Sequence, residues 1–451
     1  ICRPALLVAD EPTTALDVTI QAQILKLIND LQAELGMALL IITHDLGVVA
    51  NVAREVVVMY GGKVMESGTV DEIFRRARHP YLKALLHAVP RFHMQPGERL
   101  VPIREIKSVT GHLMAKKEPW PEAGDAAGPI LSVQGISKSY TIRKSGFFGA
   151  GPRASLLAVD DVSFDVRRGE CLGLVGESGC GKTTISKIVM RALTPDSGHV
   201  LFNDRGRMQD LLALHGNALI PYRRKMQYVF QDPFSSLNPR MTVLESVSEP
   251  LVVHNIGDAA SRLEMVRELM ALVGLDVRHL NRYPHSFSGG QRQRIGIARA
   301  LALKPDLLIC DEPVSALDVS VQAQILNLLK DLQKALGLTY LFISHNLAVV
   351  DYMADRIAVM CRGRLVELAP REVLFRNPVH PYTQALLAAV PDPDLDNRLD
   401  FRQLMEDRAS DPTAWPAPFT IDATTRAGLR EIDGGHFVRC HQDWDMRKLA
   451  A

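Results

Sequence analysis

The stretch that decides the fold is Gly176-Glu177-Ser178-Gly179-Cys180-Gly181-Lys182-Thr183. It meets the pattern G-x-x-x-x-G-K-[ST], in which glycines let backbone N–H groups wrap a phosphate and the next helix adds its positive dipole. An apolar strand candidate at 172–175 precedes the loop and a helix candidate at 184–191 follows it. We therefore predict a nucleotide-phosphate site, with Lys182 on the β- and γ-phosphates and the Thr183 hydroxyl on Mg²⁺. The alternative is a Gly-rich turn with an exposed lysine.

An acidic pair further along the chain would complete this chemistry. Asp311 and Glu312 directly follow the apolar run 307–310. Beside a phosphate loop, Asp311 is expected to hold Mg²⁺ through water, and Glu312 to polarise the water that attacks the γ-phosphate. Without the phosphate loop, the same Asp-Glu-Pro would indicate only the start of a surface loop.

The apolar pattern around these motifs predicts the fold class. The runs 307–310 and 341–343 are short and wholly apolar, which is typical of parallel strands buried on both faces. Helical periodicity follows, as at 323–336. Strands that alternate with helices predict an α/β domain with helices on both faces of the sheet.

A long duplication organises the chain. Residues 4–90 align without a gap onto 305–391: Asp10-Glu11-Pro12 recurs as Asp311-Glu312-Pro313, and His79-Pro80-Tyr81 as His380-Pro381-Tyr382. Its period far exceeds the roughly 20–50 residues of stacked repeats, so it indicates a duplicated domain. The first copy has Asp10, Glu11, Asp17 and His44 but no phosphate loop, and the chain begins at Ile1 without an initiator Met.

These features give a predicted domain organisation. We expect the C-terminal part of a first domain at 1–90, in a chain cut at its N-terminus, and a linker with five prolines at 91–129. A complete domain is expected at 130–391 and a tail of low order at 392–451.

Composition excludes several classes of protein. The 451 residues are 47% hydrophobic and 23% charged, with a formal net charge of +1, so no basic field points to nucleic acid. No apolar run reaches the roughly 18 residues of a membrane helix. The six cysteines include no CxxC pair, which suggests unpaired thiols in a reducing compartment.

Phe287-Ser288-Gly289-Gly290-Gln291 resembles the signature motif of ATP-binding-cassette proteins. The resemblance implies a phosphate-loop core with a helical subdomain and a small β subdomain, and two such domains that sandwich two ATP molecules. The signature would open a helix at 291–302 and present its amides to the γ-phosphate bound by the opposite domain.

The same resemblance implies roles for further residues. Gln231 matches the loop that senses Mg²⁺ and the attacking water, His345 the switch histidine, and Tyr140 the aromatic residue that stacks on adenine. Residues 315–318, which end at Asp318, match the loop that crosses the dimer interface. The expected catalytic residues are Glu312, His345 and Gln231. The expected metal ligands are Thr183, Gln231 and Asp311. The expected nucleotide-binding residues are Tyr140, Gly176, Ser178, Gly179, Cys180, Gly181, Lys182, Thr183, Thr184, Ser288, Gly289, Gly290, Gln291 and Asp318.

A narrower resemblance lies at 380–387, echoed at 79–86, which is similar to the C-terminal element of ATPases that drive oligopeptide, dipeptide and nickel import. The segments 141–157 and 435–438 look like the same subfamily, in which fused tandem versions exist. Some members carry an iron–sulfur centre after this element, but 392–437 contains no cysteine, so ATP and Mg²⁺ are the only cofactors expected.

The leading hypothesis is thus a peripheral ATPase on the cytoplasmic face of the inner membrane, energising import of peptides or similar small solutes such as glutathione. The resemblance implies transmembrane permease subunits and a periplasmic or extracellular solute-binding protein as partners, with cassettes that dimerise within the full-length chain or between chains. The alternatives are an importer of nickel or another solute, and a soluble tandem ATPase acting on ribosomes or DNA. The second usually has a charged helical insertion, which the Pro-rich linker does not resemble.

Overall fold

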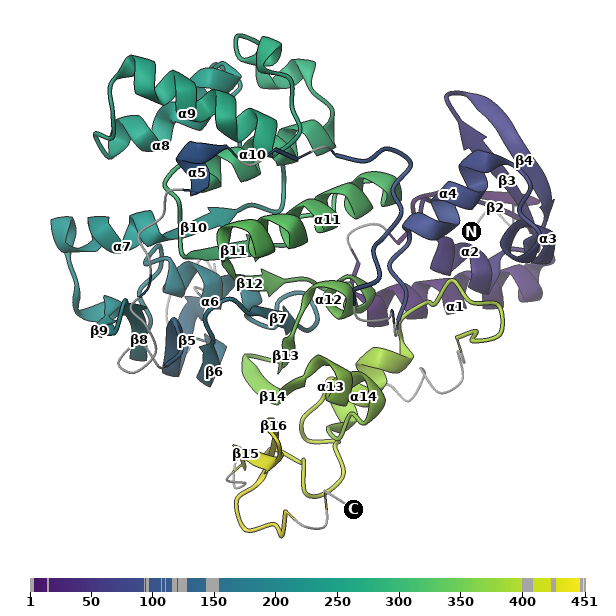
Figure 1. Ribbon diagram of the computed structural model, residues 1–451. Coiled ribbons are helices and arrows are strands. Elements are labelled where there is room, and N and C mark those ends of the chain that lie inside the picture. Colours follow the sequence, from purple (N-terminus) through teal and green to yellow (C-terminus); the bar gives the residue numbers. More distant parts are fainter. Residues whose placement is uncertain are drawn as a thin grey trace, which may run out of the picture.

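An eight-stranded sheet forms the centre of the second copy in the computed structural model (Figure 1), in the order β10-β11-β12-β7-β13-β14-β16-β15. The first five strands are parallel, and the last three continue the sheet with antiparallel pairings. Their bounds are β10 Met226–Val229, β11 Leu307–Asp311, β12 Thr339–Ile343, β7 Cys171–Val175, β13 Arg356–Cys361, β14 Arg364–Pro370, β16 His436–His441 and β15 Ala427–Asp433. The structure describes residues 4–13, 16–92, 94, 97–106, 108–109, 111–115, 120, 128–142, 154–399, 409–422, 427–446 and 449.

Both faces of this sheet are buried, as the apolar runs predict. Along β11, Leu308 and Cys310 belong to one hydrophobic cluster, while Leu307 and Ile309 belong to another on the opposite face. The helices of this core are α6 Lys182–Val189, α7 Ile220–Lys225, α11 Val319–Leu336, α12 Leu347–Met353, α13 Arg371–Arg376 and α14 Pro381–Ala388.

Two smaller units flank the core and confirm the predicted fold class. An antiparallel sheet holds β6 Ala154–Val166, β5 Leu131–Ile142, β8 Ser197–Asp204 and β9 Arg207–Asp210. The helical unit holds α8 Val243–Val253, α9 Ala259–Leu272 and α10 Gly289–Leu301. The remaining short helices are α5 His112–Ala115, η1 Leu211–Ala213, η2 Gly216–Leu219, η3 Val277–His279 and η4 Pro284–Ser286. Most of the segment 141–157 lies outside the described residues.

The first copy repeats the second half of this architecture. In chain order it holds β1 Leu6–Asp10, α1 Val18–Leu35, β2 Ala38–Ile42, α2 Leu46–Val52, β3 Glu55–Tyr60, β4 Lys63–Thr69, α3 Val70–Arg75 and α4 Pro80–Ala88. The β-bulge after Val58 in β3 recurs after Val359 in β13, at the equivalent position. Strands β1 and β2 form one small sheet and β3 and β4 another, because no described strand joins them as β7 joins β12 to β13.

The described part of the linker is docked on the second copy. Arg99 donates two hydrogen bonds to the Asp331 carboxylate on α11, at 2.7 and 2.9 Å. Leu100 is buried, and its carbonyl accepts a hydrogen bond from Asn327. Further along, the backbone N–H of Met114 donates to Glu268 on α9 at 2.6 Å. The linker thus spans the core and the helical unit of the second copy.

The expectation of low order in the tail is wrong for the hairpin of β15 and β16. β16 pairs with β14 and extends the main sheet. His436 Nε2 lies 2.7 Å from Oε1 of Glu367, a carboxylate that is fully buried and also accepts the Val379 N–H. A buried carboxylate needs such partners, so this pair fixes the hairpin to the sheet.

Among the described helices, none combines the length and the apolar character needed to cross a bilayer.

Candidate functional site

The phosphate loop lies between the end of β7 and the start of α6, as predicted. Gly176 and Gly181 have φ values of 145° and 109°, in the range that favours glycine. A Cβ at Gly176 would lie 2.1 Å from the carbonyl oxygen of Met360, and one at Gly181 would lie 2.5 Å from that of Ala158. The fold therefore requires glycine at both positions.

Lys182 is folded back into this loop. Its side chain is 5% exposed, and Nζ donates to the carbonyl oxygens of Gly176 at 2.6 Å and Glu177 at 2.9 Å. Nζ also donates to Cys180 Sγ at 3.8 Å, and no carboxylate is among these hydrogen-bond acceptors, so a phosphate can replace them. The loop thus presents a positive charge where the motif places the phosphates.

The proposed metal ligands Thr183 and Asp311 lie together. Asp311 ends β11 and is buried, and it accepts hydrogen bonds from the Thr183 hydroxyl and, at 2.5 Å, from the Tyr228 hydroxyl. Burial raises the pKa of Asp311, although both hydrogen bonds oppose that shift. The contact of Tyr228 with Asp311 was not predicted, because Tyr228 belongs to no sequence motif.

The three predicted catalytic residues also lie together. Gln231 Nε2 donates to Oε2 of Glu312 at 2.7 Å, and His345 Nδ1 lies 3.0 Å from Oε1 of Glu312. Burial pushes the pKa of Glu312 upward, but the hydrogen bond from His345 and the charge of Lys182 outweigh it, so the pKa falls below its usual value. Glu312 is therefore ionised near neutral pH, as an acceptor of a water proton must be.

The signature motif caps the helix α10. Ser288 accepts a hydrogen bond from Gln291 N–H at 3.4 Å, while the Gln291 side chain accepts from Ser288 N–H at 3.0 Å. A Cβ at Gly290 would lie 2.2 Å from Cγ1 of Val321 on α11, so this glycine allows close helix packing. Within the described residues, the motif forms no hydrogen bond with the phosphate loop.

Two predicted nucleotide contacts stay predictions. Tyr140 lies on β5 with 40% of its surface exposed and with the Lys138 ammonium 5.9 Å from its ring centroid. Thr184 lies in the first turn of α6 and is partly buried. The contact of Tyr140 is with Lys138, so adenine stacking by Tyr140 and nucleotide binding by Thr184 remain predictions.

The first copy reaches the phosphate loop of the second. Asp17 Oδ1 accepts a hydrogen bond from Ser178 N–H at 2.5 Å, and Thr19 Oγ1 donates to Glu177 Oε1 at 2.6 Å. The equivalent of Asp17 is Asp318, whose charge acts on Tyr81 of the first copy and, with burial, raises the pKa of that tyrosine. The duplication could have indicated Asp17, but nothing in the sequence marked Thr19.

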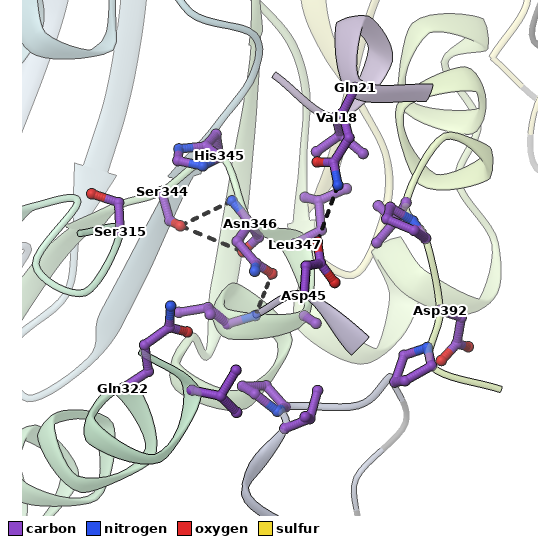
Figure 2. A pocket seen from close by; sticks show the side chains of 18 of the residues that line it. Val18, Gln21, Asp45, Ser315, Gln322, Ser344, His345, Asn346, Leu347 and Asp392 are labelled. Atoms are coloured by element: carbon purple, nitrogen blue, oxygen red, sulfur yellow. Dashed lines mark hydrogen bonds between the residues drawn. The ribbon is translucent and has the colours of Figure 1, made fainter. Parts of the chain in front are cut away.

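A cavity of about 150 Å³ lies where the two copies meet (Figure 2). It is lined by equivalent residues from both copies, which include the pair His44 and His345 and the pair Gln21 and Gln322. One pair differs in charge: Asp45 accepts a hydrogen bond from Gln21 at 3.0 Å, whereas its counterpart is the neutral Asn346. Equivalent segments of the two copies therefore face the same cavity.

Comparison with known proteins agrees with this geometry. Residues 159–315 match the family described as ABC transporter, and residues 65–113 and 366–416 match the oligopeptide/dipeptide transporter, C-terminal region. The glutathione import ATP-binding protein GsiA of Salmonella paratyphi A is 48% identical, over 99% of this chain and 70% of that protein. Its namesake in Pectobacterium atrosepticum is 45% identical, over 98% of this chain and 69% of that protein.

Among solved structures, a dimeric post-hydrolysis state of the ATP-binding cassette MJ0796 bound to ADP and Pi is 29% identical to this chain. It covers 53% of this chain and 98% of its own, with a TM-score of 0.47. The assignment rests on the phosphate loop, the acidic pair, the two matched C-terminal regions and the relatives that are nearly half identical in sequence. The chain belongs to the ABC transporter ATPases, as an ATP-binding subunit that carries the oligopeptide/dipeptide transporter C-terminal region.

Proposed function

We propose that this ATPase energises the import of glutathione or similarly small peptides across the inner membrane. The observation that supports the ATPase part best is the group formed by Glu312, Gln231 and His345 beside a phosphate loop. The peptide part is supported by the names of the relatives and by the C-terminal region, which occurs once in each copy.

In the proposed reaction, Lys182 leaves its carbonyl partners and binds the β- and γ-phosphates. Glu312 orients the attacking water and accepts a hydrogen bond from it, while Gln231 and His345 hold the carboxylate in place. Water attacks the γ-phosphorus and gives a proton to Glu312, while the bond from phosphorus to the bridging oxygen breaks to leave ADP and phosphate. Product release then allows the two copies to separate.

The residues around Thr183 fit Mg²⁺. The Thr183 hydroxyl and the Asp311 carboxylate are hard oxygen donors in mutual contact, whereas Gln231, the third predicted ligand, donates to the neighbouring Glu312. Within the described residues, no cluster of three or more His, Cys, Asp and Glu could hold a metal, which agrees with an ion that is bound largely by substrate phosphates. When bound, Mg²⁺ neutralises charge on the phosphate oxygens.

We further propose the predicted domain assignment, with the C-terminal part of a first cassette at 1–90, a linker at 91–129, a complete cassette at 130–391 and a C-terminal region at 392–451. Leu6 and Val8 are about half exposed, whereas their equivalents Leu307 and Ile309 are fully buried against the face that includes β7 and α6. The exposed apolar face of the first copy could therefore pack against a strand equivalent to β7 and a helix equivalent to α6.

The proposed partners are transmembrane permease subunits and an external solute-binding protein, with the ATPase bound peripherally at the cytoplasmic face. Membrane vesicles that contain the whole transporter would test the cargo. Labelled glutathione should accumulate with ATP and the parent chain, but not with Glu312→Gln. If glutathione and dipeptides stay outside while nickel or another solute enters, the peptide assignment is wrong and the ATPase assignment stands.

A further inference from the structure

Glu177 in the phosphate loop forms hydrogen bonds with three segments that are distant from it in sequence. The backbone N–H of Glu177 donates to the Tyr382 hydroxyl on α14 at 3.2 Å. Its Oε1 accepts from Thr19 of the first copy at 2.6 Å, and its Oε2 accepts from Ser410 of the C-terminal region at 2.7 Å. A carboxylate with both oxygens occupied by donors is held more firmly than one in water.

Two of the three anchors, Tyr382 and Ser410, are themselves fixed. Tyr382 is buried, 1% exposed, in the first turn of α14. Ser410 is placed by the segment 409–421, in which Trp415 Nε1 donates to Ala409 O at 2.6 Å. The Trp415 ring in turn packs edge-on against His380, with centroids 4.6 Å apart. The C-terminal region therefore reaches the phosphate loop through packed side chains.

Glu177 also links these anchors to the charged group of the loop. Its carbonyl oxygen is one of the two backbone acceptors of Lys182 Nζ, at 2.9 Å. A shift in the Glu177 backbone would move that acceptor and the neighbouring amide of Ser178, which Asp17 now occupies. The side chain thus contacts Thr19 and Ser410, while the backbone carbonyl contacts Lys182 of the phosphate site.

We propose that Glu177 is a positioning residue, which shapes the phosphate loop for ATP only when the first copy and the C-terminal region are both docked on it. The proposal rests on the assignment of this loop as the nucleotide site. The two carboxylate oxygens have different partners: Oε1 accepts a hydrogen bond from Thr19 of the first copy, and Oε2 accepts one from Ser410 of the C-terminal region. Each contact can therefore be removed separately. Loss of either contact lowers the affinity for ATP without touching a phosphate ligand.

The duplication supplies a matched comparison for Thr19. The equivalent residue in the second copy is Ser320, whose hydroxyl accepts a hydrogen bond from Ile103 N–H of the linker at 3.2 Å. The tail supplies another for Ser410: the Thr413 hydroxyl donates to Asp411 at 2.8 Å and does not reach the loop. Ser320→Ala and Thr413→Ala therefore remove a hydroxyl of the same kind without removing a contact to Glu177.

The test is the dissociation constant of a fluorescent ATP analogue, measured on the full 451-residue chain with its fold checked by circular dichroism. Ser410→Ala and Thr19→Val should each weaken binding about three- to tenfold, which is less than the full effect of losing a hydrogen bond to a charged group, because only part of that loss passes to the nucleotide site. Ser410→Thr should restore the parent value, and the two control variants should keep it.

A double variant decides whether the effect passes through Glu177. In a Glu177→Gln background, Ser410→Ala should weaken binding much less than it does in the parent. Parent affinity in Ser410→Ala, or an equal loss in both backgrounds, would overturn the proposal while leaving the nucleotide site intact. A parent chain that binds no nucleotide would instead overturn the assignment of the loop itself.

Discussion

His345 Nδ1 lies 3.0 Å from Oε1 of Glu312, and the same two residue types meet again in the first copy, where His44 Nδ1 lies 2.9 Å from Oε1 of Glu11. Both glutamates have a positive φ, 47° at Glu312 and 46° at Glu11. Non-glycine residues in this region are strained, and such strain collects at functional sites. The geometry of the glutamate and histidine is thus a property of the duplicated unit, whereas the phosphate loop beside it is described only in the second copy.

Glu312→Gln should abolish ATP turnover while nucleotide binding persists. The amide keeps the size of the side chain and one hydrogen bond but cannot accept a proton from water. We expect a fall in kcat of about a hundredfold or more, the range for loss of a positioned base. Phosphate release and analogue binding would be measured on the same sample. Glu372→Gln, an exposed carboxylate on α13, serves as the control. If Glu312→Gln hydrolyses ATP at the parent rate, Glu312 is not the acceptor of the water proton.

Lys182→Ala should weaken nucleotide binding, because it deletes the positive charge inside the loop. Loss of a charge-assisted contact to phosphate predicts an effect of more than about tenfold in the dissociation constant. Titration calorimetry with ATP would measure it. Lys187 lies exposed on the same helix α6, so Lys187→Ala should bind as the parent does. Equal weakening in both variants would mean that general charge, rather than the loop, attracts the nucleotide.

Gly290→Ala should impair turnover more than it impairs binding at the phosphate loop. The added methyl would lie 2.2 Å from Cγ1 of Val321, so α10 must move away from α11, at a cost of about 1–3 kcal/mol. Gly296 is on the same helix, but the nearest atom to its added Cβ is 3.9 Å away. Gly296→Ala should therefore be neutral or slightly stabilising. Steady-state ATPase rates and denaturation curves would be measured for both variants. A Gly290→Ala variant with the parent rate and the parent stability would contradict the prediction.

His436→Ala should destabilise the second copy strongly, because it leaves the buried carboxylate of Glu367 without its imidazole partner. Breaking a buried pair of this kind costs about 3–5 kcal/mol. Urea denaturation followed by tryptophan fluorescence reports it, since Trp415 lies in the adjacent packing. Glu66, the equivalent carboxylate in the first copy, is only partly buried, and it accepts hydrogen bonds from the backbone N–H groups of Arg78 and His79. Glu66→Gln should have a clearly smaller effect, and the reverse order would refute the role of the pair.

Stability should fall as the pH is lowered from about neutral, partly because of His380. Burial lowers the pKa of His380 to about 3 from its usual 6.5, so the folded state keeps it neutral. Below pH 6.5 the unfolded chain takes up a proton that the folded chain does not, and up to about 1.4 kcal/mol per pH unit is lost until the folded pKa is reached. His380→Asn keeps an acceptor for the Tyr382 N–H and should flatten this dependence. Denaturation midpoints of the parent and of His380→Asn would be measured between pH 7 and pH 4. If the two midpoints fall equally with pH, His380 does not cause the dependence.

The residues that sequence alone revealed are those with local patterns. The phosphate loop, the acidic pair and the signature are short motifs, and the structure places them between β7 and α6, at the end of β11 and at the start of α10. Tyr228, Thr19 and Ser410 were missed, because their contacts join segments far apart in sequence and leave no periodic signal. The hairpin at 427–441 had a turn signal in Gly434-Gly435, both with positive φ, but its strands lie in an otherwise irregular region.

The docked linker has a mechanical consequence. Its contacts with α11 extend from Arg99 to Ile103, whose N–H donates to Ser320, and its contacts with the helical unit begin at Ser108, whose hydroxyl donates to Leu272 O at 2.7 Å. Any rotation of the helical unit against the main sheet changes the distance between these two attachment points. A strap that is fixed at both ends must then either stretch or release one of these contacts, so the length of chain between Ile103 and Ser108 limits the angle through which the helical unit can swing.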